Sequence, residues 1–310
     1  MRITVGLPFF NNRNTLSAAI RSVYAQTLTD WELICIDDGS TDGSIALLEE
    51  ISDPRVRVFR DGLRCGLAAR LNQVADVARG AFVARMDADD LMHPQRLERQ
   101  LAHFLKFPEI DVLGTRVYSI DPKTEVRGIR GSLPQTLTAE HVLRNGTLLH
   151  PTVLARRQWF LQNRYDENWG RVQDRDLWCR TFATTIFAEV PEPLLFYRED
   201  ADSAGFRKRW RSAIAELRLV ARHGIALAGW RPSLAMASRS LAKLAINPVL
   251  HLFRGQNRLF HNRCRALSPA EAAAAADTLE TILTTPVPGW EDLAARRCHT
   301  RGHLAIPWAA

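Results

Sequence analysis

Apolar and polar segments alternate regularly over residues 2–116 of the 310-residue chain. Short apolar runs with the length of buried strands are separated by segments in which apolar residues recur every three to four positions, as they do in amphipathic helices. Strands are expected at residues 3–7, 31–36, 55–59, 81–86 and 110–115. Strands separated by helices of this length form parallel sheets with right-handed crossovers. The pattern therefore predicts an α/β fold with a mostly parallel sheet flanked by helices.

The pattern changes twice further along the chain. Residues 117–204 are less regular, and from Phe206 onward the pattern is helical and interrupted by glycine and proline. We therefore predict a first domain over residues 1–205 and a helical C-terminal extension over residues 206–310. Within this extension we expect the last 25 residues, Pro286–Ala310, to form a peripheral or partly ordered tail.

Charge separates the two parts as well. The chain carries a net charge of +7, but residues 205–265 hold 13 Lys or Arg against one acid, Glu216. This basic segment is interpreted either as a helical subdomain packed on the first domain or as a surface for anionic lipid headgroups. A nucleic-acid arm is the third interpretation, but no recognised nucleic-acid motif accompanies the charge. We therefore expect no nucleic-acid partner and keep peripheral membrane contact through residues 206–265 as a prediction.

Cysteine use and hydropathy bear on the location of the protein. The five cysteines are scattered and none forms a CxxC pair, so neither a disulfide framework nor a zinc site is indicated. No apolar run reaches the roughly 18 residues of a membrane span, and the first apolar run is too short for a signal peptide. A cytoplasmic protein, peripheral on the inner face of the membrane, is the expectation.

Acidic residues follow two of the predicted strands. Asp37 and Asp38 come after residues 31–36, and Asp87, Asp89 and Asp90 come after residues 81–86. Ligands of open parallel sheets bind at the carboxyl ends of the strands. Carboxylates held close together repel one another unless a cation binds, and oxygen ligands without His or Cys favour Mg²⁺ or Mn²⁺. The alternative interpretation of either acidic turn is a helix cap in a solvated loop, but two at successive strand ends favour a metal–diphosphate site.

Three motifs together resemble those of family 2 glycosyltransferases with the GT-A fold, a Rossmann-like fold. They are V-G-L-P-F-F-N-N (5–12), I-C-I-D-D-G-S-T-D (34–42) and A-R-M-D-A-D-D-L-M-H-P-Q-R-L-E-R-Q (84–100). The resemblance covers about residues 2–200. The third motif is similar in detail to that of bacterial enzymes that build surface polysaccharides. It implies that residues 1–205 form a GT-A catalytic domain. It also implies transfer of a sugar from a nucleotide-sugar donor, with UDP as the nucleotide, onto a hydroxyl acceptor such as a lipid-linked saccharide.

The resemblance also implies roles for single residues. Pro8 and Phe10 match positions that line the nucleotide base, and Asp38 matches the carboxylate that hydrogen-bonds the base. Asp89 matches the metal-binding acid of the DxD motif. Asp87 matches its partner near the ribose and the metal, which would be Mn²⁺ or Mg²⁺.

Two later segments extend the resemblance. H-P-T-V-L-A-R-R (150–157) resembles a segment that places His150 near the donor or acceptor pocket, although a hydrogen-bonded histidine before a turn is an equal alternative. Q-D-R-D-L-W (173–178) resembles an E-D-Y-D-L-W pattern whose first aspartate is the catalytic base, which implies that Asp174 is the base. Here Gln173 stands where the family has Glu. We interpret Asp176 as a structural residue paired with Arg180 at i+4.

The segment Phe196–Arg198 resembles the family's Y-R-x-H sequence, which closes the site. Asp200 stands where that pattern has His, so the resemblance assigns no further ligand there.

These roles imply a metal-dependent, inverting displacement in which Asp174 takes the proton of the acceptor. Two alternative functions compete with this one. A catalytically silent nucleotide-sugar-binding protein is disfavoured because Asp38, Asp87, Asp89 and Asp174 are all present. A nucleotidyltransferase is disfavoured because P-F-F-N-N-R-N after the first strand lacks a Gly-rich phosphate loop.

Overall fold

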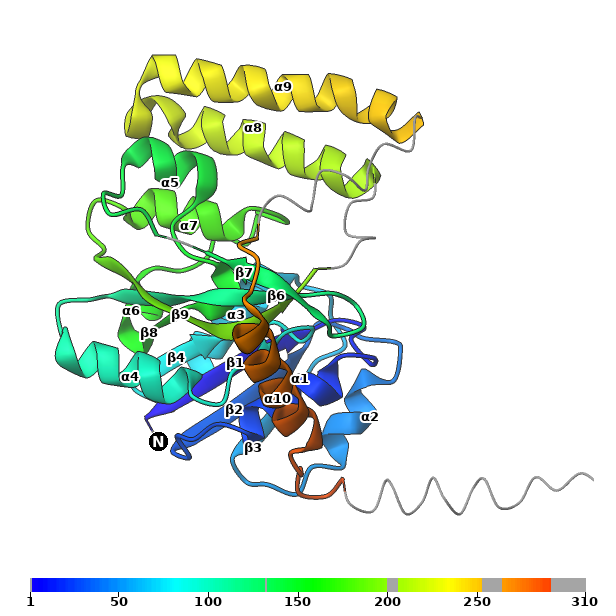
Figure 1. The fold of residues 1–310 in the computed structure, drawn as a ribbon. Helices are drawn as coiled ribbons and strands as arrows, with labels where there is room; N and C mark the ends of the chain where they lie inside the picture. The colour runs from blue at the N-terminus through cyan, green and yellow to red at the C-terminus, as the bar shows by residue number, and fades with distance from the viewer. Residues whose placement is uncertain (1, 132, 200–205, 253–263, 291–310) are drawn as a thin grey trace, which may run out of the picture.

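The computed structural model describes residues 2–131, 133–199, 206–252 and 264–290 (Figure 1). Its first half alternates strands and helices as expected. Four parallel strands form one side of the sheet, in the order β3-β2-β1-β4. The strands are β1 (Ile3–Phe9), β2 (Trp31–Asp37), β3 (Val56–Arg60) and β4 (Phe82–Arg85), and the helices between and after them are α1 (Leu16–Tyr24), α2 (Ser44–Glu49), α3 (Leu67–Val77) and α4 (Arg96–Lys106).

The other side of the sheet is mixed in direction. The short strand β8 (Leu154–Arg156) inserts antiparallel between β4 and β6 (Val112–Ile120), so β6 runs in the same direction as β4 without pairing with it. Beyond β6 lie β9 (Phe187–Arg198), parallel to β6, and β5 (Leu91–Met92), while β7 (Val126–Arg130) pairs with β6. The predicted fold class, a mostly parallel sheet flanked by helices, is confirmed.

The two central strands are buried on both faces. Every residue of β1 and β2 is buried, which explains why both read as continuous apolar runs rather than as alternating ones. Close packing of α3 on β1 depends on Gly6, because an added Cβ there would lie 2.5 Å from Cγ1 of Val74. The sheet and its helices therefore hold the carboxyl ends of β1, β2 and β4 in fixed positions.

A helical hairpin occupies one end of the molecule. Helices α8 (Phe206–Ala228) and α9 (Trp230–Leu252) are joined at Gly229, whose φ of +83° suits glycine. The hairpin packs on α5 (Ala139–Asn145) and α7 (Gln173–Thr181), as Figure 1 shows. None of the described helices combines the length and the apolar character that crossing a bilayer requires.

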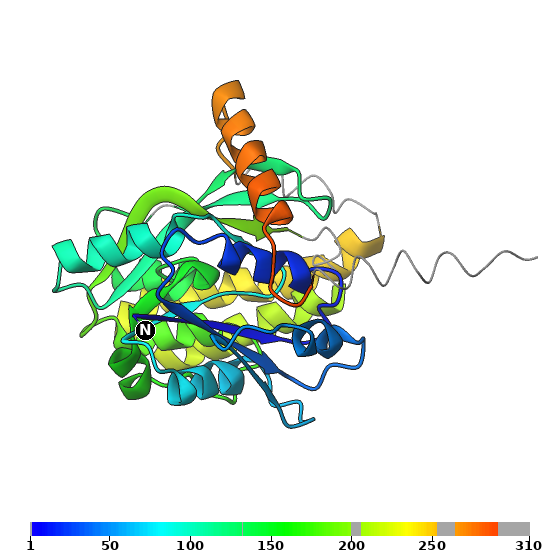
Figure 2. The same ribbon diagram turned by 90° about the horizontal axis from the view of Figure 1, so that it is seen from below.

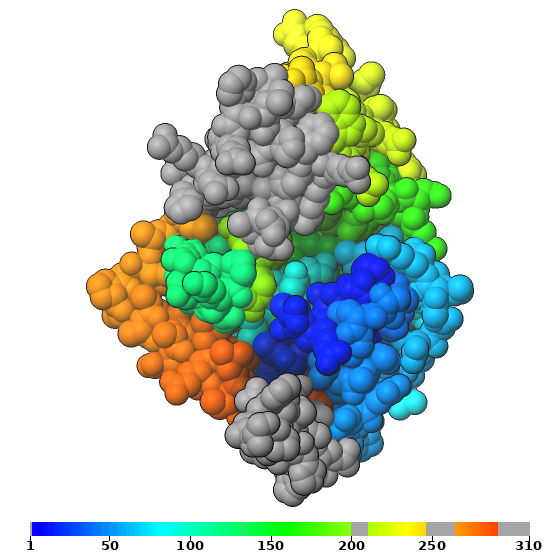
Figure 3. Space-filling model, turned by 90° about the vertical axis from the view of Figure 1, so that its right-hand side faces the viewer, coloured from blue at the N-terminus to red at the C-terminus, as the bar shows by residue number. Residues whose placement is uncertain are grey.

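The chain then returns to the first half of the protein. Helix α10 (Pro269–Thr284) lies along α1 and β7, and Figures 2 and 3 show it on the flank of the molecule beside the N-terminal half. Val287 and Trp290 are buried in the same apolar cluster as the residues of β1 and α1. Gly289 permits this close approach, because an added Cβ would collide with the carbonyl oxygen of Glu50.

The expectation of a peripheral tail is therefore wrong for residues 286–290, because Val287 and Trp290 are buried in the core. The sequence showed one Trp and one Val among turn residues, too few for a periodic signal. Residues 291–310 lie outside the described residues. The predicted domain boundary at residue 205 also lies outside them and stays a prediction.

Candidate functional site

A cavity of about 290 Å³ lies at the carboxyl ends of β1, β2 and β4. Five side chains predicted from the sequence line it together. They are Pro8, Phe10, Asp38, Asp87 and Asp89. These side chains lie close together because the strands are parallel, so the residues that follow each strand lie at the same edge of the sheet.

Asp38 is buried in the wall of this cavity and accepts several hydrogen bonds. Its carboxylate accepts from the backbone N–H groups of Cys65 at 2.8 Å and Gly66 at 3.0 Å, and from Nε of Arg70 at 3.0 Å. Asp38 therefore ties the end of β2 to the loop that leads into α3. Its predicted contact with a nucleotide base stays a prediction.

Arg70 is a cavity residue that the sequence analysis missed. It is 3% exposed, and its guanidinium makes two further bonds to Asp61, at 2.7 and 2.8 Å. The sequence did contain a signal for its burial, because Arg70 lies four residues before Val74 and therefore on the apolar face of α3. Across the cavity mouth, the exposed Arg64 places its guanidinium 3.9 Å from the ring centroid of Phe10.

The acidic cluster forms the opposite wall. One carboxylate oxygen from each of Asp87, Asp89 and Asp90 lies within 4.8 Å of the others. Reduced solvation and the charge of Asp87 raise the pKa of Asp89 to about 6. Burial and the charge of Asp89 raise the pKa of Asp90 well above its usual value.

One oxygen of this cluster lacks a partner. Oδ1 of Asp90 accepts from the backbone N–H of Arg198 at 2.9 Å, but buried Oδ2 has no partner among the described residues. Three converging carboxylates and a buried oxygen without a donor fit a hard divalent cation. The Arg198 contact also places the predicted closing segment against the cluster, whereas Asp200 lies outside the described residues.

Two buried arginines lie behind the carboxylates, and the sequence analysis missed both. Nη2 of Arg85 pairs with Asp87, while Nε and Nη1 have no partner among the described residues. Nη2 of Arg96 donates to the carbonyl oxygen of Arg85 at 2.9 Å. Burial and the neighbouring Arg85 lower the pKa of Arg96 to about 9. Their positive charge offsets part of the acidic charge of the cluster.

His150 lies in the short 3₁₀ helix His150–Thr152 and is not among the described residues that line the cavity. Its Nε2 is 2.8 Å from the hydroxyl oxygen of Tyr165, and its ring meets Trp178 edge-on. Burial and the charge of Arg85 hold its pKa well below 6.5, so the ring is neutral at physiological pH. A place for His150 in the donor or acceptor pocket stays a prediction.

Asp174 is the second residue of α7 and is half-buried. Its carboxylate has no hydrogen-bond or ion-pair partner within the described ranges. It too is not among the residues lining the cavity described above. Burial raises the pKa of the Tyr165 phenol, and the charge of Asp174 raises it further. The backbone before the helix is unusual, since Val172 has a φ of +56°. An unpartnered carboxylate is free to accept a proton, which the role of a base requires.

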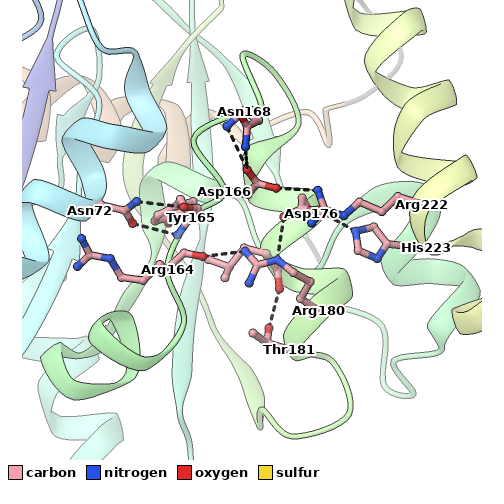
Figure 4. A network of polar contacts seen from close by, with 11 residues as sticks. Asn72, Arg164, Tyr165, Asp166, Asn168, Asp176, Arg180, Thr181, Arg222 and His223 are labelled. Atoms are coloured by element: carbon pink, nitrogen blue, oxygen red, sulfur yellow. Dashed lines mark hydrogen bonds and ion pairs between the residues drawn. The ribbon is translucent and has the colours of Figure 1, made fainter.

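Asp176 behaves differently, as the sequence predicted. It is fully buried, and its carboxylate accepts from Nε of Arg180 at 2.9 Å and contacts Nε2 of His223 at 2.7 Å. Figure 4 shows Arg180 of α7 and His223 of α8 converging on Asp176. The structural interpretation of Asp176 is confirmed, and the additional contact joins α7 to the helical hairpin.

Comparison with known proteins identifies the family. The family model described as Glycosyl transferase family 2 matches residues 4–172. EpsE of Bacillus subtilis, named as a glycosyltransferase, is 31% identical over 215 residues, which are 67% of this chain and 76% of EpsE. The Escherichia coli protein WfgD is 32% identical over 143 residues, 46% of this chain and 55% of WfgD; its name is UDP-Glc:alpha-D-GlcNAc-diphosphoundecaprenol beta-1,3-glucosyltransferase.

Solved structures agree on the fold. Residues 1–349 of TarS from S. aureus, solved in complex with UDP-GlcNAc, align with a TM-score of 0.55 at 15% identity, over 99% of this chain and 93% of that one. The mannosyltransferase PcManGT from Pyrobaculum calidifontis, solved with GDP-Man and Mn²⁺, aligns with a TM-score of 0.54 at 17% identity, over 97% and 80%. Architecture and motifs together show the GT-A fold, and the chain belongs to glycosyltransferase family 2.

Proposed function

We propose that this glycosyltransferase transfers a sugar from a UDP-sugar to a hydroxyl acceptor with inversion at the anomeric carbon. The observation that carries the proposal is the strand-end cavity. Pro8, Phe10 and Asp38 form one wall, where a base and ribose would lie, and the carboxylates of Asp87 and Asp89 form the other. TarS with UDP-GlcNAc and PcManGT with GDP-Man and Mn²⁺ support a nucleotide-sugar donor in a GT-A protein.

The acidic wall suits a divalent cation and a diphosphate. Asp89 and Asp87 would hold Mn²⁺ or Mg²⁺, with Asp90 close by. When bound, such an ion offsets the negative charge that develops on the departing diphosphate. Arg85 contributes from behind by holding Asp87 in place through their ion pair. The carboxylates thus orient the donor so that its anomeric carbon faces the acceptor side.

The chemistry requires one displacement. The acceptor oxygen forms a bond to the anomeric carbon as the bond to the diphosphate oxygen breaks, and that electron pair leaves with UDP. Asp174 takes the proton of the acceptor hydroxyl. A positioned general base of this kind contributes about 10²–10⁴ in rate. Attack opposite the leaving group inverts the configuration, and the unpartnered carboxylate of Asp174 supports the assignment.

The acceptor is proposed to be a lipid-linked saccharide in the synthesis of a cell-surface polysaccharide or glycolipid. The name of WfgD, which specifies a diphosphoundecaprenol acceptor, supports this class. Residues 206–310 would then act as an extension of the catalytic domain 1–205, with residues 206–265 contacting the inner face of the cytoplasmic membrane. Trp230, Leu234 and Leu241 support the contact, because these large apolar side chains are exposed on α9.

A donor screen tests the proposal. The purified protein is incubated with UDP-, GDP- and dTDP-sugars, with Mn²⁺, with Mg²⁺ or with EDTA, and release of the nucleoside diphosphate is measured. We expect release from one or more UDP-sugars that depends on the metal. The stereochemistry of a transferred product is then read by NMR. Binding without turnover for every donor would support the silent-binding alternative, and retention of configuration would contradict the single displacement.

A further inference from the structure

A second polar cavity lies where the helical hairpin meets the catalytic domain. Its volume is about 200 Å³, and it shares no lining residue with the strand-end cavity. Four helices contribute charged side chains to it. These are Arg144 of α5, Arg175 of α7, Glu216 of α8, and Arg239 and Lys243 of α9. Four cations thus surround one carboxylate in a space large enough for a small anion.

Glu216 is already occupied by neighbours within the cavity. Its Oε1 lies 3.5 Å from Nη1 of Arg175, and its Oε2 lies 2.7 Å from Nζ of Lys243. The hydroxyl of Ser240 donates to the same Oε2 at 3.2 Å. The carboxylate therefore neutralises one of the four positive charges and leaves an excess of about three.

Arg175 forms the floor of the cavity and is fixed in place. Its side chain is 15% exposed, and its Nη2 donates to the carbonyl oxygen of Leu143 at 2.6 Å. Its Nε is buried and has no partner among the described residues. A buried, charged N–H without an acceptor is costly, so negative charge close to this guanidinium would be favourable.

Arg144 and Arg239 are the remaining cations. Both are exposed, and neither has a hydrogen-bond or ion-pair partner in the part of the chain that the structure describes. The sequence offers little compensation nearby, since it contains no Asp or Glu between Leu217 and Ala270. Two unneutralised guanidinium groups thus line the cavity together with the fixed one of Arg175, and guanidinium N–H groups are well suited to bind phosphate oxygens.

We propose that this cavity is a binding site for a phosphate group, either a diphosphate or a phosphate monoester. The proposal goes beyond the transfer reaction and does not depend on the donor or on the metal. Helices from the catalytic domain and from the hairpin both supply cations. Occupancy by an anion would therefore also strengthen the packing of the hairpin on α5 and α7.

The test uses the full-length protein and inorganic pyrophosphate in EDTA-containing buffer of low ionic strength, with binding measured by calorimetry. The pocket variant is Arg144→Ala/Arg239→Ala. Its matched control is Arg79→Ala/Arg99→Ala, which removes two exposed arginines that lie outside residues 206–265 and do not line the cavity. Both variants lower the net charge equally. Circular dichroism and UDP binding check that each variant keeps its fold.

We expect the pocket variant to weaken pyrophosphate binding by about tenfold or more, because two charged hydrogen-bond donors are lost from the cavity. The control should change the dissociation constant by less than about threefold. Arg144→Lys/Arg239→Lys should recover part of the affinity. Absence of binding to the wild-type protein, an unaffected pocket variant, or equal losses in pocket variant and control would each overturn the proposal.

A second arm identifies the source of the phosphate. Phosphatidylcholine vesicles with and without phosphatidic acid are sedimented with each protein. A lipid source predicts that phosphatidic acid recruits the wild-type protein and that the pocket variant loses this recruitment while the control keeps it. A soluble source predicts that recruitment is equal in the pocket variant and the control, while the calorimetric difference persists. Low-salt conditions are kept throughout, because salt screens exposed charges.

Discussion

Nε of Arg70 donates to the carboxylate of Asp38 at 3.0 Å, and the opposite side of the same guanidinium is held by Asp61. Arg70 therefore connects the cavity wall to the loop between β3 and α3. This connection gives Asp38 two ways to affect nucleotide binding. It can act directly through the base, or indirectly through the position of Arg70 and the loop.

Replacing Asp38 separates these two routes. Asp38→Ala should raise the dissociation constant of UDP by about 10- to 150-fold, the equivalent of about 1.5–3 kcal/mol for a hydrogen bond to a charged group, with or without metal. Asp61→Ala removes a different partner of Arg70, one that does not line the cavity. If the two variants lose UDP affinity equally in calorimetry, Asp38 acts through Arg70 and its predicted contact with the base is wrong.

Removal of the Asp89 carboxylate should abolish the dependence of UDP affinity on the metal. In Asp89→Asn the cluster loses the residue assigned as the main metal ligand, so UDP should bind equally with Mn²⁺ and with EDTA. Calorimetry of UDP in both buffers provides the measurement, with Asp111→Asn as the control for an acid distant from the cavity. A Mn²⁺ enhancement as large as that of the wild type would show that another group holds the ion.

Asp174→Asn keeps the shape of the side chain and removes its capacity to accept a proton. The affinity for UDP and metal should stay near that of the wild type, while transfer falls by about 10²-fold or more. Product formation under saturating donor and acceptor is the readout. The competing role is a purely structural one in the first turn of α7, under which the Asn variant should stay active. Transfer above about a third of the wild-type rate would move the base to another residue, with His150 the next candidate.

The pH dependence of stability should report the Asp176 network. Burial alone would raise the pKa of Asp176, but hydrogen bonds from His223 and Arg180 hold it below 3.8 in the folded protein. A lowered folded-state pKa means that the carboxylate contributes stability above pH 3.8 and that the contribution is lost as the pH falls through the folded-state value. Loss of one partner of a buried pair costs roughly 3–5 kcal/mol.

Asp176→Asn tests this dependence by urea unfolding at a series of pH values. The deficit relative to the wild type should be largest near neutral pH. It should shrink as the pH falls below 3.8 toward the folded-state pKa of Asp176, where the wild-type carboxyl also becomes neutral. A deficit that is constant across the series would show that the charge of Asp176 contributes nothing. Asp166→Asn provides a comparison, because Asp166 also pairs with α8, through Arg222 at 2.6 Å, but is less buried than Asp176 and has an exposed partner.

Membrane contact has its own test. Trp230→Ser/Leu241→Ser should reduce sedimentation with vesicles that contain phosphatidylglycerol by several-fold, because these residues are 62% and 55% exposed on α9 and each buried apolar side chain contributes about 1.5–3 kcal/mol. Leu105→Ser/Ile186→Ser removes apolar side chains of similar exposure elsewhere. Equal sedimentation of the two double variants would contradict a membrane role for α9.

The first half of the fold was predictable because its signals are local. Mostly apolar runs marked β1, β2 and β4, and acidic residues at or just beyond the ends of β2 and β4 marked the cavity. The second half of the fold depends on pairing between strands that are far apart in the sequence, and such pairing produces weaker sequence patterns. Strand β9 contains Pro191 and Pro193 and pairs with β6 through a register shift at Arg116, so its sequence does not read as a central strand. Arg85 and Arg96 were missed because burial of a cation depends on neighbours that are distant in sequence.

Trp290 has a consequence for how the protein is made. Its indole N–H donates to the carbonyl oxygen of Leu47 at 2.8 Å, and its ring packs in the cluster that contains Leu16 and Ile20. During synthesis the first strands of the sheet therefore leave the ribosome long before Trp290, the side chain that packs against α1 and α2. During that interval the apolar surface of α1 and α2 is exposed to solvent and to chaperones. Messages truncated before codon 290 should consequently yield chains that aggregate, even when every cavity residue is present.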